Sequence, residues 1–68
     1  MHSQPLTLRE TEIVKWIAEG KTNFEIAIIL GISRATVKTH VEHVLQKLDV
    51  TTRTAAAVCA VREGVLTT

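Results

Sequence analysis

The chain has 68 residues, a hydrophobic fraction of 46%, a charged fraction of 22% and a formal net charge of +1. A chain of this length forms one small domain at most, and this composition is that of a globular protein rather than a disordered tail. The longest apolar run, residues 26–30, is far shorter than the ~20 residues that span a bilayer, so we expect no membrane partner. Cys59 is the only cysteine, which excludes an internal disulfide and favours the cytoplasm.

Positive charge is concentrated in one part of the chain. Residues 1–32 carry a net charge of −1 and residues 54–68 are balanced, whereas residues 33–53 carry +2 and two histidines in addition. A local excess of Lys and Arg is typical of a nucleic-acid interface, but solvated helix faces often look the same. The charge distribution by itself leaves both interpretations open.

Two copies of one capping signal predict the first two helices. A threonine followed three residues later by a glutamate occurs at residues 7–10 and again at 22–25, which is the capping-box pattern. Apolar residues follow each signal at helical spacing, and Gly20 and Gly31 supply left-handed ends. We therefore expect helices over about residues 8–19 and 23–30.

Two further helices complete the chain. Ser33 can cap the longest one, and Thr51 or Thr52 can cap an alanine-rich one that Gly64 ends. The longest helix carries one apolar stripe at helical spacing, made of Val37, Val41, Val44, Leu45 and Leu48. These helices are expected over about residues 34–48 and 53–63. No strand pattern competes, so the predicted fold class is all-α, a compact four-helix bundle. We expect residues 1–6 to be a leader or linker, 7–66 the domain and 67–68 a tail.

The turn between the second and third predicted helices is too short to let them run antiparallel. A turn of about three or four residues with a glycine favours a helix-turn-helix, in which the helices cross at about 90–120°. Gly31 allows a positive φ, and Ala27 lets the next helix approach closely. The third helix would then project from the body, where it can enter the major groove of DNA.

The polar side of the third helix provides the candidate base contacts. A projection at about 100° per residue places this side opposite the apolar stripe, and the N-terminal half of such a helix reaches the base edges. Lys38 could donate to guanine, and Glu42 could accept from cytosine N4. Thr39 could offer its methyl group to thymine or its hydroxyl to either base. The candidate base contacts are Ala35, Lys38, Thr39 and Glu42.

Further candidate contacts lie at the helix starts, on the rim of this surface and on the fourth helix. Residues at helix starts or on the rim are placed for phosphates: Thr22, Asn23, Ser33, Arg34, Thr36, His43, Lys47 and Arg53. Three alanines of the fourth helix suit packing onto the body. The other side of that helix is the candidate dimer interface, made of Ala55, Val58, Cys59 and Arg62. The alternative is that Val58 and Cys59 complete a single core.

Glu10 lies on the same face of the first helix as three apolar residues. A buried charge must be satisfied, so we expect this carboxylate to cap the helix and to pair within the core. Its partner cannot be named from the sequence. A catalytic role is not expected, because no nucleophile, base or second acid accompanies it.

Six short segments, in this order and spacing, resemble the LuxR/GerE/NarL-type DNA-binding domain of bacterial transcription regulators. They are Leu6-Thr7-Leu8-Arg9-Glu10, Gly20-Lys21-Thr22-Asn23, Glu25-Ile26-Ala27, Leu30-Gly31-Ile32-Ser33, Thr36-Val37-Lys38-Thr39-His40 and Lys47-Leu48-Asp49-Val50. The resemblance covers about residues 6–66. It implies a dimer on double-stranded DNA, with the third helix in the major groove and the fourth packed against its twin.

The resemblance also implies functions for particular residues. Lys38 matches the base-contacting lysine of the family, and Thr39 matches the variable reader beside it. Glu42 stands where NarL-like members have a basic DNA-contacting residue, so the base sequence that they read cannot be carried over to this chain. The three most characteristic positions of the quorum-sensing branch are matched by Glu10, Val14 and Gly20.

The leading expectation is sequence-specific DNA binding by the effector domain of a bacterial transcription regulator. The alternative is a protein-interaction module that uses the same helical corner without DNA, which the near-neutral charge and Glu42 favour. A promoter-reading region of a sigma factor is a structural cousin, and the fourth helix argues against it. No nucleophile–base pair or phosphate loop can be assembled, and His40, His43 and Cys59 lack the spacing of a zinc site. We therefore expect no enzyme, no cofactor and no metal.

Other partners are expected beyond DNA. Helix two needs three apolar residues inward, which leaves Ile28 or Ile29 outward. Together with Trp16 they could form a surface for RNA polymerase or for another domain of the same polypeptide. Most members of the family that the chain resembles carry an N-terminal sensing or receiver domain, so we expect an excised domain; a free-standing GerE-like protein is the alternative. The expected location is the bacterial cytoplasm, on the nucleoid when bound.

Overall fold

The computed structural model describes residues 5–64, and within that range the chain forms four α-helices joined by short turns. They are α1 (Leu8–Ala18), α2 (Asn23–Leu30), α3 (Arg34–Leu48) and α4 (Arg53–Arg62). The predicted all-α class and the four helices are confirmed. The predicted tail and all but two residues of the predicted leader lie outside the described range. None of the helices in that range has the length and apolar character that a membrane span requires.

Each helix begins at a Ser or Thr whose hydroxyl accepts a backbone N–H. At α1 the Glu10 N–H donates to Thr7 Oγ1, and the Thr7 N–H donates to Glu10 Oε1 at 2.8 Å. The same reciprocal pair closes the start of α2. The predicted capping boxes are therefore confirmed, and they satisfy amides that have no partner within the helix. The four caps are Thr7, Thr22, Ser33 and Thr52.

Three of the helices end in a Schellman motif, a pair of hydrogen bonds around a left-handed residue. At the end of α2 the Gly31 N–H donates to the Ile28 carbonyl at 3.3 Å, and the Ile32 N–H donates to the Ala27 carbonyl at 3.0 Å. The left-handed residues are Gly20 (φ 85°), Gly31 (φ 68°) and Asp49 (φ 57°).

The predicted ends of α1 and α4 were each one residue too long. Glu19 and Glu63, the last residues of the two predicted helices, have ψ values of 0° and 3°. This conformation closes a tighter last turn ahead of the following glycine. The glycines thus mark the chain reversal, and the regular helix ends before them.

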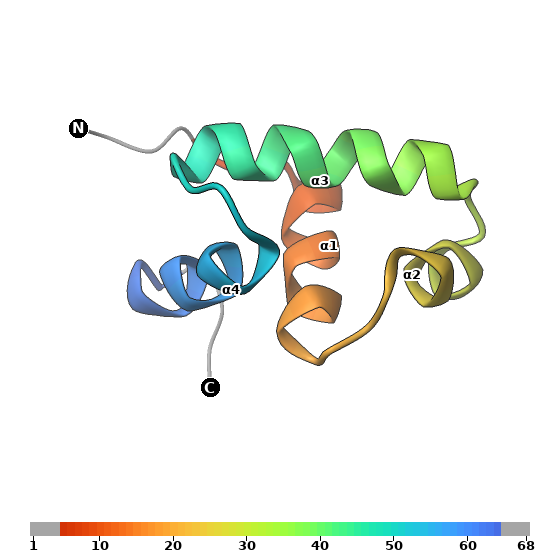
Figure 1. Cartoon of the computed structure of the whole chain (residues 1–68), viewed down its shortest axis with the longest axis horizontal. Helices are drawn as coiled ribbons and strands as arrows, with labels where there is room; N and C mark the ends of the chain where they lie inside the picture. The colour runs from red at the N-terminus through yellow and green to blue at the C-terminus, as the bar shows by residue number, and fades with distance from the viewer. Residues whose placement is uncertain (1–4, 65–68) are drawn as a thin grey trace.

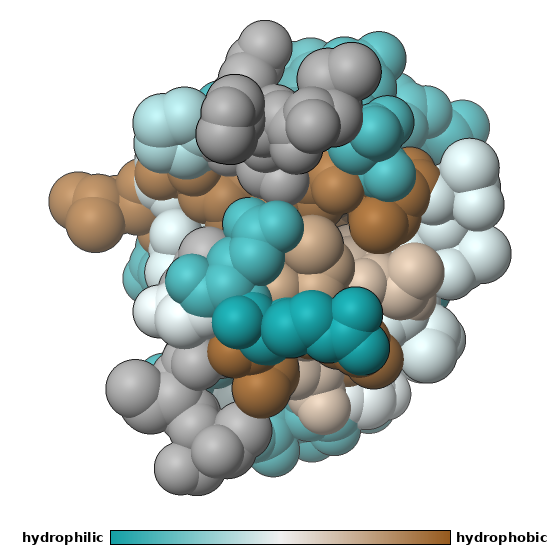
Figure 2. Space-filling view, turned by 90° about the vertical axis from the view of Figure 1, so that its left-hand side faces the viewer, coloured by the Kyte–Doolittle hydropathy of each residue, from teal (hydrophilic) through white to brown (hydrophobic). Residues whose placement is uncertain are grey.

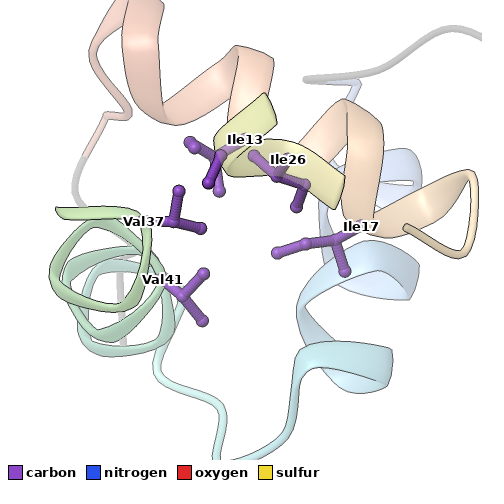
Figure 3. Close-up of a cluster of buried hydrophobic side chains, with 6 residues drawn as sticks. Ile13, Ile17, Ile26, Val37 and Val41 are labelled. Carbon is purple, nitrogen blue, oxygen red and sulfur yellow. The ribbon is translucent and has the colours of Figure 1, made fainter. Parts of the chain in front are cut away.

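Two apolar clusters share α1 and α3. In the first, between α1, α2 and α3, the side chains of Ile13, Ile17, Ile26, Val37 and Val41 point toward one another (Figure 3). The second, between α1, α3 and α4, contains Val14, Val44, Leu48, Ala56 and Ala60. Figure 1 shows the result: α1 stands in the middle, α2 and α4 lie on either side of it, and α3 runs across the top. Because α3 packs on the body along one side only, its other side is left for a partner.

Candidate nucleic-acid interface

The orientation of α3 follows from its apolar stripe. Val37 and Val44 are fully buried, and Val41 and Leu48 are nearly so. The turn of residues 31–33 turns the chain away from α2, so that the start of α3 stands at the edge of the molecule (Figure 1). The predicted outward polar side is confirmed, because the residues on it are all exposed: Ala35, Lys38, Thr39, Glu42, His43 and Gln46.

Local hydrogen bonds decide which groups this side presents. Thr39 Oγ1 donates to the Ala35 carbonyl at 3.1 Å, so Thr39 presents its methyl group and oxygen lone pairs rather than its hydroxyl proton. Lys38 and Glu42 lie one turn apart, and neither forms an ion pair with another residue of the described range. An ammonium donor, a methyl group and a carboxylate acceptor therefore stand together on the N-terminal half of α3.

The start of α3 is fixed against the start of α2. Ser33 Oγ accepts the Thr36 N–H at 3.0 Å and lies 2.9 Å from Thr36 Oγ1. The Arg34 guanidinium carbon lies 5.4 Å from the centre of the Phe24 ring, within cation–π range. Phe24 was not among the predicted site residues. Its position as the second residue of α2, inside the capping box, was the only indication in the sequence that it lies near the site.

Three of the predicted phosphate contacts, Asn23, Lys47 and Arg53, form side-chain bonds to residues far away in the chain. Lys47 Nζ lies 2.7 Å from Glu10 Oε1, and the side chains of Lys47 and Glu10 are only 23% and 6% exposed. Arg53 donates through Nη1 to Asn23 Oδ1 at 2.7 Å and through Nη2 to the Lys21 carbonyl at 2.8 Å. Lys47 and Arg53 thus anchor parts of the fold to one another, which the sequence did not predict.

Glu10 is a buried, paired carboxylate, as predicted. Burial by itself would raise its pKa, but hydrogen bonds from Lys47 and from the Thr7 backbone, together with the Lys47 charge, lower the pKa below its usual value. The ion pair joins the first turn of α1 to the last turn of α3. Lys47 is the partner that sequence reasoning could not name, because the two residues are 37 positions apart.

The other predicted phosphate contacts are exposed: Thr22, Ser33, Arg34, Thr36 and His43. An open groove beside the starts of α2, α3 and α4 is lined by Lys21, Arg34 and Arg53 among others. None of its lining residues, all of which belong to the described range, is acidic. Lys21 was not predicted as a site residue, although it directly precedes the cap of α2. The groove thus concentrates positive charge next to the candidate base-reading side.

The outer side of α4 is partly apolar. Val58 is 51% exposed, so the alternative that it completes the core is wrong, and Arg62 is exposed as well. Ala55 and Cys59 are half-buried, and Cys59 packs against the second cluster. Val61, 38% exposed, was missed, although it lies one turn from Val58. Figure 2 looks onto the side of the molecule where α4 lies, and shows apolar residues at the surface beside hydrophilic ones.

The Cys59 thiol donates to Glu63 Oε2 at 3.3 Å. Partial burial, followed by the hydrogen bond and the negative charge of Glu63, raises the pKa of this thiol. A raised pKa keeps the sulfur protonated and weakly nucleophilic. Cys59 therefore behaves as a small packing residue of α4.

Comparison with known proteins gives a consistent family. Residues 4–60 match the family model described as bacterial regulatory proteins, luxR family. The chain is 58% identical over 59 residues to the transcriptional regulatory protein LiaR of Bacillus subtilis (strain 168), which covers 87% of this chain and 28% of that protein. It is 48% identical over 61 residues to the quorum sensing-dependent transcriptional regulator RpaR of Rhodopseudomonas palustris, covering 90% and 25% respectively.

One solved structure has the same fold and matches this chain over nearly the whole length of both proteins. The transcription factor GerE superimposes with a TM-score of 0.85 and 37% identity, over 91% of this chain and 92% of that one. By contrast, this chain spans between 19% and 29% of the length of the first curated relatives it matches.

Proposed function

We propose that this chain, which belongs to the luxR family of bacterial regulatory proteins, binds double-stranded DNA of specific sequence as the effector domain of a transcription regulator. In this proposal α3 lies in the major groove. The observation that carries it is the two-sided character of α3: its apolar stripe is buried, and Lys38, Thr39 and Glu42 are exposed on the opposite side. A helix held in this way offers its N-terminal half to base edges.

The proposed base contacts are those of the N-terminal half of α3. Lys38 donates to guanine O6 and N7, and Glu42 accepts from a cytosine amino group. Thr39 contacts a thymine methyl through its own methyl group, because its hydroxyl proton is already donated to Ala35. Ala35 packs against a neighbouring base edge, since its side chain is small and exposed.

The proposed phosphate contacts surround this surface. Thr22 and Ser33 stand at the starts of α2 and α3, where helix N-termini attract anions. Arg34 adds a positive charge between them. The remaining members of the proposed set are Asn23, Thr36 and His43. Lys47 and Arg53, which were also predicted, are left out because their cationic groups are bonded within the molecule. Such contacts fix the position of the protein on the duplex and supply most of the salt-dependent affinity.

We propose that α4 forms a homodimer on DNA. Its outer side combines Ala55, Val58, Cys59 and Arg62 with the additional apolar residue Val61, and the exposed valines support an apolar contact. Two copies related by a two-fold axis would place their α3 helices about 34 Å apart, one turn of DNA.

An upstream domain and RNA polymerase are further proposed partners, on the nucleoid in the cytoplasm. The named relatives are several times longer than this chain, which supports an upstream sensing or receiver domain. Ile28 and Ile29 are both exposed on α2, and either partner could cover them. Ile29→Asp should then reduce transcription activation in a full-length regulator while thermal unfolding is unchanged. Unchanged activation with intact folding would contradict the contact.

The decisive experiment for the DNA proposal is selection from a random duplex pool with the purified protein. We expect enrichment of two inverted half-sites, one helical turn apart from centre to centre. Enrichment of a single half-site would remove the dimer from the proposal. No enrichment, together with no affinity for any duplex at low salt, would favour a protein-interaction module instead.

A further inference from the structure

We propose that Arg53 is a positioning residue for DNA binding and not a phosphate ligand. Its guanidinium holds the start of α2 in place from the first residue of α4. The inference rests on the proposed function, because the contact that Arg53 positions is the proposed phosphate contact at the start of α2.

The geometry is that of a two-point clamp. Arg53 Nη1 donates to Asn23 Oδ1 at 2.7 Å, and Nη2 donates to the Lys21 carbonyl oxygen at 2.8 Å. A guanidinium is a rigid planar fork, so two bonds from different nitrogens fix its orientation as well as its position. Both hydrogen bonds are short and charge-assisted, and such bonds are stronger than hydrogen bonds between neutral groups. They join segments that are 30 and 32 positions apart in the chain.

The two acceptors of the clamp belong to the residues on either side of Thr22, the cap of α2. Lys21 comes directly before Thr22, and Asn23 comes directly after it. Within the capping box the amides of Thr22 and Glu25 already have carboxylate and hydroxyl partners. No hydrogen bond among residues 5–64 uses the amides of Asn23 and Phe24. The clamp therefore sets the direction in which these two amides can meet a phosphate oxygen.

Arg34 provides a matched comparison within the same molecule. Arg34 and Arg53 are each the first residue of a helix, and both line the open groove. Arg34 is exposed and lies over the Phe24 ring, and its guanidinium forms no hydrogen bond with other residues of 5–64. Arg53 is half-buried, and its two terminal nitrogens are bonded to the protein. Equal charges at similar positions therefore act in different ways.

The clamp can be tested in the free protein, without DNA. Amide hydrogen exchange is measured at residues 22–25 in the wild type, Arg53→Lys and Asn23→Ala, with thermal unfolding as the control for the whole fold. We expect exchange at Thr22 and Glu25 to quicken on the order of tenfold in both variants, because the clamp protects the box by a charge-assisted bond. Amides of the middle of α3 should exchange as in the wild type. Unchanged exchange at the box would overturn the proposal.

The consequence for DNA is tested by the salt dependence of binding to a mixed-sequence duplex. Arg34→Ala should reduce the slope of log affinity against log salt by about 0.9, as the loss of one phosphate contact does. Arg53→Lys keeps the charge but not the fork, and should weaken binding on the order of tenfold with an unchanged slope. The loss in Arg53→Lys combined with Asn23→Ala should be smaller than the sum of the two single losses, because both variants break the same bond of the clamp.

Each result has a distinct meaning. If Arg53→Lys binds as tightly as the wild type while Arg53→Ala lowers the slope as Arg34→Ala does, Arg53 is a phosphate ligand and the proposal is overturned. If the wild type binds no duplex at low salt, the proposed function fails. The exchange measurement still decides in that case whether the clamp holds the start of α2.

Discussion

At the scale of single residues, the proposed reading of bases depends on Lys38. Its ammonium is exposed on the N-terminal half of α3 and has no ion-pair partner among residues 5–64. We expect Lys38→Ala to cost about 1–3 kcal/mol at one base pair of the selected site, because a lysine–guanine contact discriminates by that amount. Competition binding with every single-base variant of the site measures it. A uniform loss across all variants would assign Lys38 to a phosphate.

The ion pair between Glu10 and Lys47 gives the fold a defined response to acid. The pKa of Glu10 is lowered in the folded protein. A lowered pKa means that the pair contributes stability above the usual value of 4.5 and that this contribution is lost as the pH falls through the lowered value. Glu10→Gln should therefore be less stable than the wild type at neutral pH, and its stability should fall less steeply in acid.

Urea unfolding from neutral to acidic pH measures this response. Lys47→Ala leaves the buried carboxylate without its cation, which should cost about 3 kcal/mol at neutral pH, more than Glu10→Gln does. Parallel stability curves for the wild type and Glu10→Gln would show that Glu10 titrates equally in the folded and unfolded chain.

At the scale of helices, starts and ends were mostly predictable because their signals are local. A capping box needs residues only three positions apart, and glycine at a left-handed end is the usual choice. Asp49 breaks this pattern: it ends α3 at φ 57° although it has a Cβ. It also places a negative charge at the negative end of the α3 dipole. The left-handed backbone and the unfavourable charge both cost stability, and the sequence gives no sign that an aspartate ends the helix in this way. The left-handed end of α3 was therefore not predicted.

Asp49→Gly should therefore stabilise the domain by about 0.5–1 kcal/mol, since it relieves the left-handed strain and removes an unfavourable charge. Asp49→Asn is the matched variant, because it removes the charge and keeps a side chain that tolerates the left-handed region. Thermal unfolding of both separates the two causes. A destabilising Asp49→Gly would mean that the Asp49 side chain makes a contact of its own.

The polar side of α3 could be predicted for a similar reason. Once the valines at helical spacing are assigned to the core, geometry places Lys38 and Thr39 on the outside. The pairings of Lys47 and Arg53 are of another kind. Their partners lie 30 to 37 positions away in the chain, and only the packing of the four helices brings them together. Residue patterns within one helix cannot predict contacts over such separations, so the sequence did not predict these pairings.

At the scale of the whole molecule, two apolar clusters on either side of α1 give the domain two ends with different tasks. The end with α2 and the start of α3 carries the proposed DNA contacts, and the end with α4 carries the proposed dimer interface (Figure 1). Because α1 and α3 belong to both clusters, a dimer through α4 would fix the spacing of the two reading helices. The proposed dimer is thus a geometric condition for reading two half-sites together.

Val58→Asp tests this condition, because it places a charge on the exposed apolar side of α4. We expect a monomer by sedimentation and affinity for the full inverted site reduced on the order of 100-fold. Val58 also lines the groove that holds Arg34 and Arg53, so affinity for an isolated half-site should fall as well, but by far less. Leu8→Asp is the control: Leu8 is 89% exposed on α1, so the same change there adds an equal charge on another helix. If Val58→Asp still assembles two copies on the inverted site with wild-type affinity, the two copies meet through another surface.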